Sequence, residues 1–233
     1  MPKIIGFFGS YPADICMYAA YALQNAGRCV CVVDNSEDGI LYQAVPTPDQ
    51  QLNAVTFHNV DFMRWEPLVQ WHELDYEFIL VQLGDRPQEL CLALCSVRIL
   101  VMDCERRNLD FYHQFMQESS LPMVVLLRGF CPDQMDAARM KEHFEQENVF
   151  IDRWLMLPFD EADESYRIEM QYRRLYKFAR ISAGMERILM QLLRMMEIHD
   201  RMRIIRAVRD AKQGKMEQRY DSRPRNAHKL RIL

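Results

Sequence analysis

The sequence contains no run of 18 apolar residues, and no positively charged start followed by a short apolar stretch. We therefore expect neither a membrane-spanning helix nor a signal peptide, which makes the cytoplasm the default location. Cysteine is present at positions 16, 29, 31, 91, 95, 104 and 131, but without the paired C-x₂-C spacing of a zinc site. Because most of these cysteines lie in apolar segments, where cysteine acts as a small hydrophobic residue, no metal site is predicted.

The sequence also lacks the residues that several common classes of functional site require. A dinucleotide site needs G-x-G-x-x-G after the first strand, and Gly6 and Gly9 do not supply it. A phosphoacceptor receiver domain needs an acidic pair where Phe7-Phe8-Gly9 stands, and an aspartate where Gln82 stands. The six histidines, at positions 58, 72, 113, 143, 199 and 228, are scattered and form no Ser/His/Asp or Cys/His arrangement. These enzyme classes are therefore not predicted.

The chain has a length and composition typical of one α/β domain. It contains 233 residues, of which 49% are hydrophobic and 11% aromatic, enough for a substantial core. Its net charge of −4 conceals a division, because residues 201–233 carry +8 and residues 1–200 carry −12. An acidic body with a basic C-terminal region predicts either an interaction surface or simply a solvated helix end with a flexible terminus.

The first 34 residues have the pattern of a βαβ unit. Residues 3–8 (KIIGFF) predict a strand, 14–25 (DICMYAAYALQN) a helix closed by Ala26 and Gly27, and 29–33 (CVCVV) a second strand. A right-handed crossover makes these strands parallel, so their carboxyl ends lie on one edge of the sheet. Ligands of open α/β sheets bind at that edge, which places the loop of residues 9–13 where a functional site is expected.

The rest of the chain continues this alternation. We predict strands at 76–83, 98–102, 123–127 and 149–156, and helices at 87–95, 109–119, 133–147 and 168–180. Residues 35–76 are the least regular, with a short edge strand at 52–57 and two tryptophans, Trp65 and Trp71, that cover a groove or simply pack. The alternation predicts a three-layer, doubly wound, mainly parallel sheet with helices on both faces.

The segment from Ala20 to Gly27 and then Val30 to Asp34 resembles the opening of the ParA/MinD-type (SIMIBI) P-loop ATPases. These proteins have a strand, a glycine-rich loop with lysine, a helix ending in Ala-Gly, a strand and an aspartate. The turn at residues 157–160 (LPFD) resembles a further motif of that family. The resemblance spans residues 3–197 and implies a P-loop NTPase-like fold, with ATP and magnesium as the family's cofactors.

The residues that would bind the nucleotide depart from the family pattern. The phosphate-binding lysine aligns with Pro12 and the magnesium-binding hydroxyl with Ala13, in a loop about four residues shorter than the family's. Proline removes a backbone donor, Tyr11 brings bulk, and no lysine occurs in residues 4–140. Gln82 replaces the aspartate that holds magnesium, and an amide lacks the charge that a hard cation favours. The resemblance thus predicts a degenerate site, without bound cofactor or metal, formed by Gly9, Ser10, Tyr11, Pro12, Ala13, Asp34 and Gln82.

The C-terminal part is predicted to be helical. Ser182 is a suitable N-cap for a long helix to about Lys212, whose second half projects or lies on another surface, and residues 215–233 are predicted to be disordered. We divide the chain into a degenerate α/β domain, 1–197, and a basic extension, 198–233. Apolar and basic residues alternate in the extension and predict a partner-binding face: Arg201, Met202, Arg203, Ile205, Arg206 and Arg209. Deleting residues 201–233 is expected to leave the domain folded and to abolish recruitment.

Two functions remain open from the sequence. The first is a non-catalytic adaptor or localisation protein that binds a protein partner, by analogy with the atypical TadZ/CpaE type of pilus assembly and secretion. This hypothesis includes a homodimer through the face around Tyr11, Pro12 and Asp34. It also includes peripheral contact with a membrane or localisation at the cell pole, whereas nucleic acid is not an expected partner. The alternative is an ATP-binding switch or weak ATPase with an altered phosphate loop. Binding of magnesium-ATP distinguishes the two.

Overall fold

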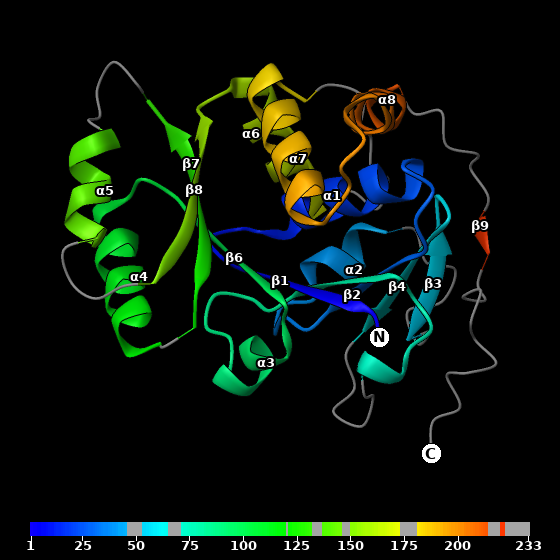
Figure 1. Ribbon diagram of the computed structural model, residues 1–233, viewed down its shortest axis with the longest axis horizontal. Coiled ribbons are helices and arrows are strands. Elements are labelled where there is room, and N and C mark those ends of the chain that lie inside the picture. The colour runs from blue at the N-terminus through cyan, green and yellow to red at the C-terminus, as the bar shows by residue number, and fades with distance from the viewer. Residues whose placement is uncertain are drawn as a thin grey trace.

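A computed structural model describes residues 1–45, 53–64, 71–119, 121–131, 137–145, 150–172, 181–213 and 220–221. Within this part, nine strands form one sheet in the order β8-β7-β6-β1-β5-β2-β4-β3-β9 (Figure 1). Neighbouring strands from β8 to β4 are parallel, and β3 pairs antiparallel with β4 and β9. The strands are β1 (Lys3–Gly9), β2 (Val30–Asp34), β3 (Ala54–Phe57), β4 (Val60–Arg64), β5 (Phe78–Gln82), β6 (Val97–Met102), β7 (Met123–Phe130), β8 (Ile151–Pro158) and β9 (Tyr220–Asp221).

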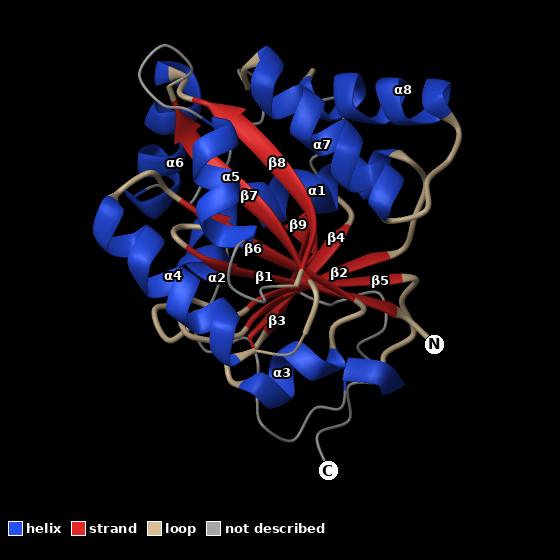
Figure 2. Cartoon of the chain, turned by 60° about the vertical axis from the view of Figure 1, so that its left-hand side comes forward, coloured by secondary structure: helices blue, strands red, loops and turns tan. Residues whose placement is uncertain are grey.

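Helices cover both faces of the sheet and enclose two apolar cores. One core lies beneath α1, α2, α7 and α8, and the other lies beneath α3 and α4 on the opposite face (Figure 2). The predicted three-layer α/β architecture is confirmed. The helices are α1 (Ala13–Asn25), α2 (Ile40–Ala44), α3 (Glu89–Leu94), α4 (Arg106–Glu118), α5 (Ala137–Glu145), α6 (Glu161–Tyr172), α7 (Ala183–Met195) and α8 (Arg201–Lys212), with a 3₁₀ turn at Trp71–Glu73.

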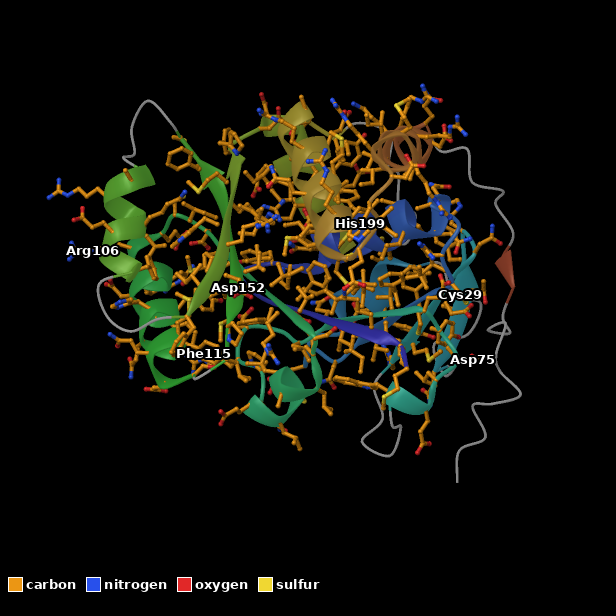
Figure 3. All side chains as sticks on the ribbon, viewed as in Figure 1. Cys29, Asp75, Arg106, Phe115, Asp152 and His199 are labelled. Atoms are coloured by element: carbon orange, nitrogen blue, oxygen red, sulfur yellow. The ribbon has the colours of Figure 1, made fainter. Side chains whose placement is uncertain are left out.

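Side chains alternate along the central strands and supply both cores. In β1, Phe7 packs beneath α1, while Phe8 faces the other layer and meets Phe115 of α4 at a ring-centroid distance of 5.7 Å. Figure 3 shows Phe115 on the inner side of α4, whereas Arg106 extends outward from the start of the same helix. A parallel strand covered on both faces is apolar nearly throughout, which explains the KIIGFF pattern.

The strand-to-helix connection after β1 depends on a glycine. Gly9 has a φ of +100°, and a Cβ added there would lie 2.2 Å from the carbonyl oxygen of Val101 on β6. No side chain fits that space, because the obstacle is backbone. Gly9 therefore allows β1 to turn directly into α1 while remaining against β6.

The predicted continuous helix from Ser182 to about Lys212 is wrong. Ser182 does cap α7, since its Oγ accepts a hydrogen bond from the Met185 N–H at 3.0 Å. The chain then leaves the helix at Glu197, which adopts a left-handed φ of +64°, and Asp200 caps the separate helix α8. The break resembles a Schellman ending, with the Ile198 N–H bonded to the Leu193 carbonyl, although glycine usually occupies the left-handed position.

Other predictions differ from the structure in smaller ways. The sequence did not predict β4 and α2, and α6 begins at Glu161 rather than at residue 168. Tyr220 and Asp221 pair with β3, so the prediction of disorder is wrong at these two residues. Trp65, residues 173–180 and the rest of the predicted disordered tail lie outside the described residues.

Candidate functional site

The loop between β1 and α1 spans only Ser10, Tyr11 and Pro12. The N–H groups of Gly9 and Ser10 donate to the carbonyl oxygens of Gly84 and Val101 at 2.9 and 2.8 Å. Tyr11 holds a left-handed φ of +52°, which is uncommon for a residue with a side chain. The donors at the end of β1 are thus bonded to β6 and to the segment after β5, so they cannot form the start of a phosphate cradle.

A buried ion pair lies beside this loop. Arg128, near the end of β7, donates from both terminal nitrogens to the Asp14 carboxylate in the first turn of α1, at 2.8 and 2.6 Å. The side chains are 7% and 1% exposed, so this two-point pair is almost fully removed from water. Burial alone would lower the pKa of Arg128, but the attraction and hydrogen bonds of Asp14 outweigh it and raise that pKa. Arg128 is therefore charged.

Two residues of α6 extend the ion pair into a network that holds Tyr11. Arg128 also donates to the Tyr11 carbonyl oxygen at 3.3 Å, and the guanidinium carbon of Arg167 lies 4.3 Å from the centre of the Tyr11 ring. Glu164 accepts from Arg167 Nε at 2.9 Å and lies 3.9 Å from Arg128 Nε. The hydrogen bond from Arg167 is the main reason that the pKa of Glu164 is lowered. We call Tyr11, Asp14, Arg128, Glu164 and Arg167 the Arg128 network.

Asp34 and Gln82 are neighbours on adjacent strands at the same edge. Asp34 accepts from the backbone and hydroxyl of Ser36 and from the Tyr42 N–H at 2.8 Å, so it organises the turn into α2. Burial raises the pKa of Asp34, although these hydrogen bonds oppose the shift. Gln82 is 3% exposed, and its Oε1 has no hydrogen-bond partner among the described residues. Asp34 thus has a structural role, whereas the Gln82 oxygen is left unexplained by the fold.

The structure brings the seven predicted site residues to one edge of the sheet, at the carboxyl ends of β1, β2 and β5. It adds Asp14, Arg128, Glu164 and Arg167, which were not predicted as site residues from the sequence. Asp14 in the first helical turn and Arg128 at a strand end were visible signals, but their pairing spans 114 residues. Among the described residues, no group of three His, Cys, Asp or Glu side chains could hold a metal ion.

The six predicted partner-binding residues lie away from this edge, on α8. Ile204, Ala207, Val208 and Ala211 of that helix are buried in the core shared with α1. Arg203 donates through Nε to the Ala26 carbonyl oxygen at 2.7 Å, where a cation suits the C-terminus of α1. Arg201, Met202, Ile205, Arg206 and Arg209 are exposed and form what we call the outer face of α8. No helix in the described part is long and apolar enough to cross a membrane.

The order of strands and the turn into α1 define a doubly wound α/β fold. No protein-family model and no curated protein matches the sequence. Solved structures do match, among them a ParA family ATPase and a MinD cell division protein, which supports the resemblance seen in the sequence at the level of the fold.

Three of these structures illustrate the similarity. A ParA family ATPase from Chlorobium tepidum has a TM-score of 0.55 and 14% identity, covering 91% of this chain and 99% of that one. A putative plasmid partition protein from Borrelia burgdorferi, bound to AMPPNP, has a TM-score of 0.52 and 16% identity, covering 85% and 100%. The MinD cell division protein of Aquifex aeolicus has a TM-score of 0.52 and 10% identity, covering 89% and 95%. At such identities the shared feature is the fold.

Proposed function

We propose that this chain is a nucleotide-independent adaptor with a ParA/MinD-like fold, which acts by binding a protein partner and not by hydrolysing ATP. The observation that carries the proposal is the Asp14–Arg128 pair. In phosphate-binding folds, the N-terminus of the helix after the first strand attracts the phosphates. Here that helix end holds a buried carboxylate of the protein itself, already bonded to Arg128.

The neighbouring groups support the same proposal. A triphosphate needs backbone donors, a cation for its charge and a carboxylate that positions magnesium. The loop offers Tyr11 and Pro12 where the donors and lysine would be, and Gln82 stands in the place of the carboxylate. The Borrelia neighbour binds AMPPNP, so the fold itself accommodates a nucleotide. The difference in this chain therefore lies in its side chains and in the length of its loop.

The partner forms the second part of the proposal. The outer face of α8 exposes Met202 and Ile205 among Arg201, Arg206 and Arg209, a combination that suits an acidic protein surface with an apolar patch. A component of a pilus or secretion complex is the kind of partner that we propose, by analogy with the TadZ/CpaE type. Polar or membrane-peripheral localisation would follow from that partner, and a homodimer would use the exposed ring of Tyr11.

The first prediction is that magnesium-ATP leaves the melting temperature unchanged. If the chain bound ATP with a dissociation constant of about 10 μM, about 1 mM nucleotide would stabilise it by about 2.7 kcal/mol. Such a gain would raise the melting temperature by several degrees for a domain of this size. The measurement is differential scanning calorimetry with magnesium-ATP, magnesium-ADP and magnesium alone.

Titration calorimetry and a phosphate-release assay complete this test. Saturable binding of magnesium-ATP with micromolar affinity, or phosphate release above that of a buffer blank, would contradict the adaptor proposal. Either result would favour the ATP-binding switch instead. Pro12→Lys serves as the companion variant. This variant is expected neither to bind nor to hydrolyse ATP, because a lysine alone restores neither the missing loop residues nor the magnesium-binding carboxylate.

A further inference from the structure

The exposed side of α6 combines apolar and acidic residues. Residues four, three and four positions apart share one side of a helix, and in α6 they form what we call its outer stripe: Glu161, Ser165, Ile168 and Tyr172. Ile168 is 46% exposed and Tyr172 is 82% exposed. Large apolar side chains that lie together on a surface, with polar residues around them, indicate an interaction surface. The outer stripe of α6 is therefore a candidate contact surface.

A cavity of about 540 Å³ adjoins the outer stripe at the start of α6. The described residues that line it include three carboxylates and no lysine or arginine: Asp160, Glu161, Ala162, Ser165, Tyr166 and Glu169. Arg167, on the same helix, donates from Nε to Glu164 at 2.9 Å and so is already paired with another carboxylate. A guanidinium group, which is a pure donor with positive charge, matches such a lining.

The outer face of α8 carries the opposite charge together with a similar apolar content. Met202 is 67% exposed and Ile205 is 37% exposed, and the other three residues of this face are arginines. The two helices also match in length, since α6 and α8 each contain 12 residues and therefore span about 18 Å. In charge, apolar content and length, the outer stripe of α6 thus complements the outer face of α8.

These two surfaces lie apart in one molecule. Helix α8 packs on α1 and α7, whereas α6 packs beside α2. Figure 2 shows α6 at the left of the molecule and α8 at its upper right. A contact between them must therefore join different molecules. Because it pairs two unlike surfaces, each added copy presents both surfaces again, and association continues as a chain or closes into a ring.

We propose that this protein associates with itself head to tail, with the outer face of α8 of one copy on the outer stripe of α6 of the next. Met202 and Ile205 pack on Ile168 and Tyr172, and the arginines of α8 meet the carboxylates at the start of α6. The second copy is the occupant because its α6 supplies the acidic charge and the apolar surface that α8 requires. The inference rests on the adaptor proposal only in taking the outer face of α8 as a binding surface.

Sedimentation velocity of the full chain, from about 5 to about 200 μM, tests this association. A contact between two short helices is smaller than a standard interface, so we expect a dissociation constant of tens of micromolar at about 50 mM salt. Raising the salt to about 500 mM should weaken the association several-fold, because screening reduces the attraction between exposed charges. A mass that stays monomeric up to about 200 μM at low salt would overturn the proposal.

Charge exchange distinguishes this contact from other modes of association. One variant reverses the charge of the α8 face: Arg201→Glu, Arg206→Glu and Arg209→Glu. A second reverses the charge on α6: Glu161→Lys and Glu169→Lys. Each should weaken association about tenfold or more, because attraction becomes repulsion. A chain that carries all five substitutions should associate again, since both faces have then exchanged their charges. If this combined variant stays monomeric although it is folded, α6 and α8 do not form the contact.

Two further variants complete the experiment. Arg106→Glu, on the exposed pair with Asp110 of α4, is the matched control for a reversed charge and should leave association unchanged. An equal loss in this control would show a general effect of net charge and would contradict the contact. Ile168→Ser tests the apolar part and should weaken association about fivefold or more. Melting curves report whether each variant is folded, and Ile168→Ser, at an exposed position, decides the result if a charge variant does not fold.

The outcomes for self-association and for the adaptor are separate. Binding of magnesium-ATP would contradict the adaptor and leave the head-to-tail contact to be judged by sedimentation. A monomeric chain whose variant with three reversed arginines nevertheless loses its localisation would contradict self-association. In that case the outer face of α8 would bind an acidic surface of a different protein, as the adaptor proposal states.

Discussion

Replacement of Arg128 by methionine is expected to lower the free energy of unfolding by about 3–5 kcal/mol, because it leaves the Asp14 carboxylate buried without its partner. Asp14 is only 1% exposed, so its carboxylate has almost no contact with water to offset the lost guanidinium. The variant also loses the hydrogen bond to the Tyr11 carbonyl. Urea denaturation followed by circular dichroism measures the loss.

A double-mutant cycle distinguishes a lost charge partner from a lost side-chain volume. Adding Asp14→Asn to Arg128→Met should recover a large part of the stability, since the unpaired charge disappears while the amide oxygen still accepts from the Ile15 N–H. Arg106→Met is the matched control, as Arg106 forms an exposed pair with Asp110 on α4 and should cost less than about 1 kcal/mol. Equal losses for Arg128→Met and Arg106→Met would show that the buried pair has no special contribution.

The same ion pair bears on the proposed function. Arg128 contacts both Tyr11 and Asp14 at the start of α1. From α6, Arg167 stacks on the Tyr11 ring and Glu164 pairs with Arg128. A phosphate at the N-terminus of α1 would meet the Asp14 carboxylate, which already pairs with Arg128 in a nearly dry environment. Under the adaptor proposal, an internal bridge between β7, α1 and α6 takes the place that a ligand would have at this edge.

The elements that the sequence predicted well have local signals. Residues 3–34 combine an apolar strand, a helix ended by Gly27 and a second apolar strand, and the structure follows this pattern within about one residue. The parallel order and the edge site follow from that alternation. These features need only short-range periodicity and the known handedness of βαβ units.

The features that the sequence did not predict depend on distant partners. Strand β4 contains Asp61, and aspartate is more typical of loops than of strands. The Asp61 carboxylate is nevertheless buried and accepts a hydrogen bond from the Tyr76 hydroxyl at 2.8 Å. The break between α7 and α8 occurs at Glu197, whose left-handed backbone is not signalled by a glycine; its carboxylate pairs with Lys3 at 2.7 Å. Likewise, nothing local indicates that Arg128 faces Asp14. Each of these contacts depends on tertiary packing, so the periodicity of apolar residues along the sequence does not predict it.

Deletion of α8 and the residues after it is expected to destabilise the domain, contrary to the expectation from sequence that residues 201–233 are dispensable for folding. Ile204 and Val208 are 1% and 3% exposed, and they pack in the core that includes α1. Losing the burial of these two side chains alone costs about 3–6 kcal/mol, before the loss of the Arg203 bond to Ala26. The measurement is urea denaturation of the chain ending at Asp200 beside the full chain.

Because truncation confounds folding with recruitment, the role of the outer face needs variants that spare the inner one. Arg201→Glu, Arg206→Glu and Arg209→Glu together reverse the charge of exposed positions and should change the free energy of unfolding by no more than about 1 kcal/mol. The adaptor proposal then requires that a fluorescent fusion of this variant lose its localisation, whereas Arg106→Glu on α4, the charge control, retains it. If the folded triple variant localises like the wild type, the role of α8 is structural, through its packing on α1. The edge around Tyr11 would then be the candidate partner-binding surface.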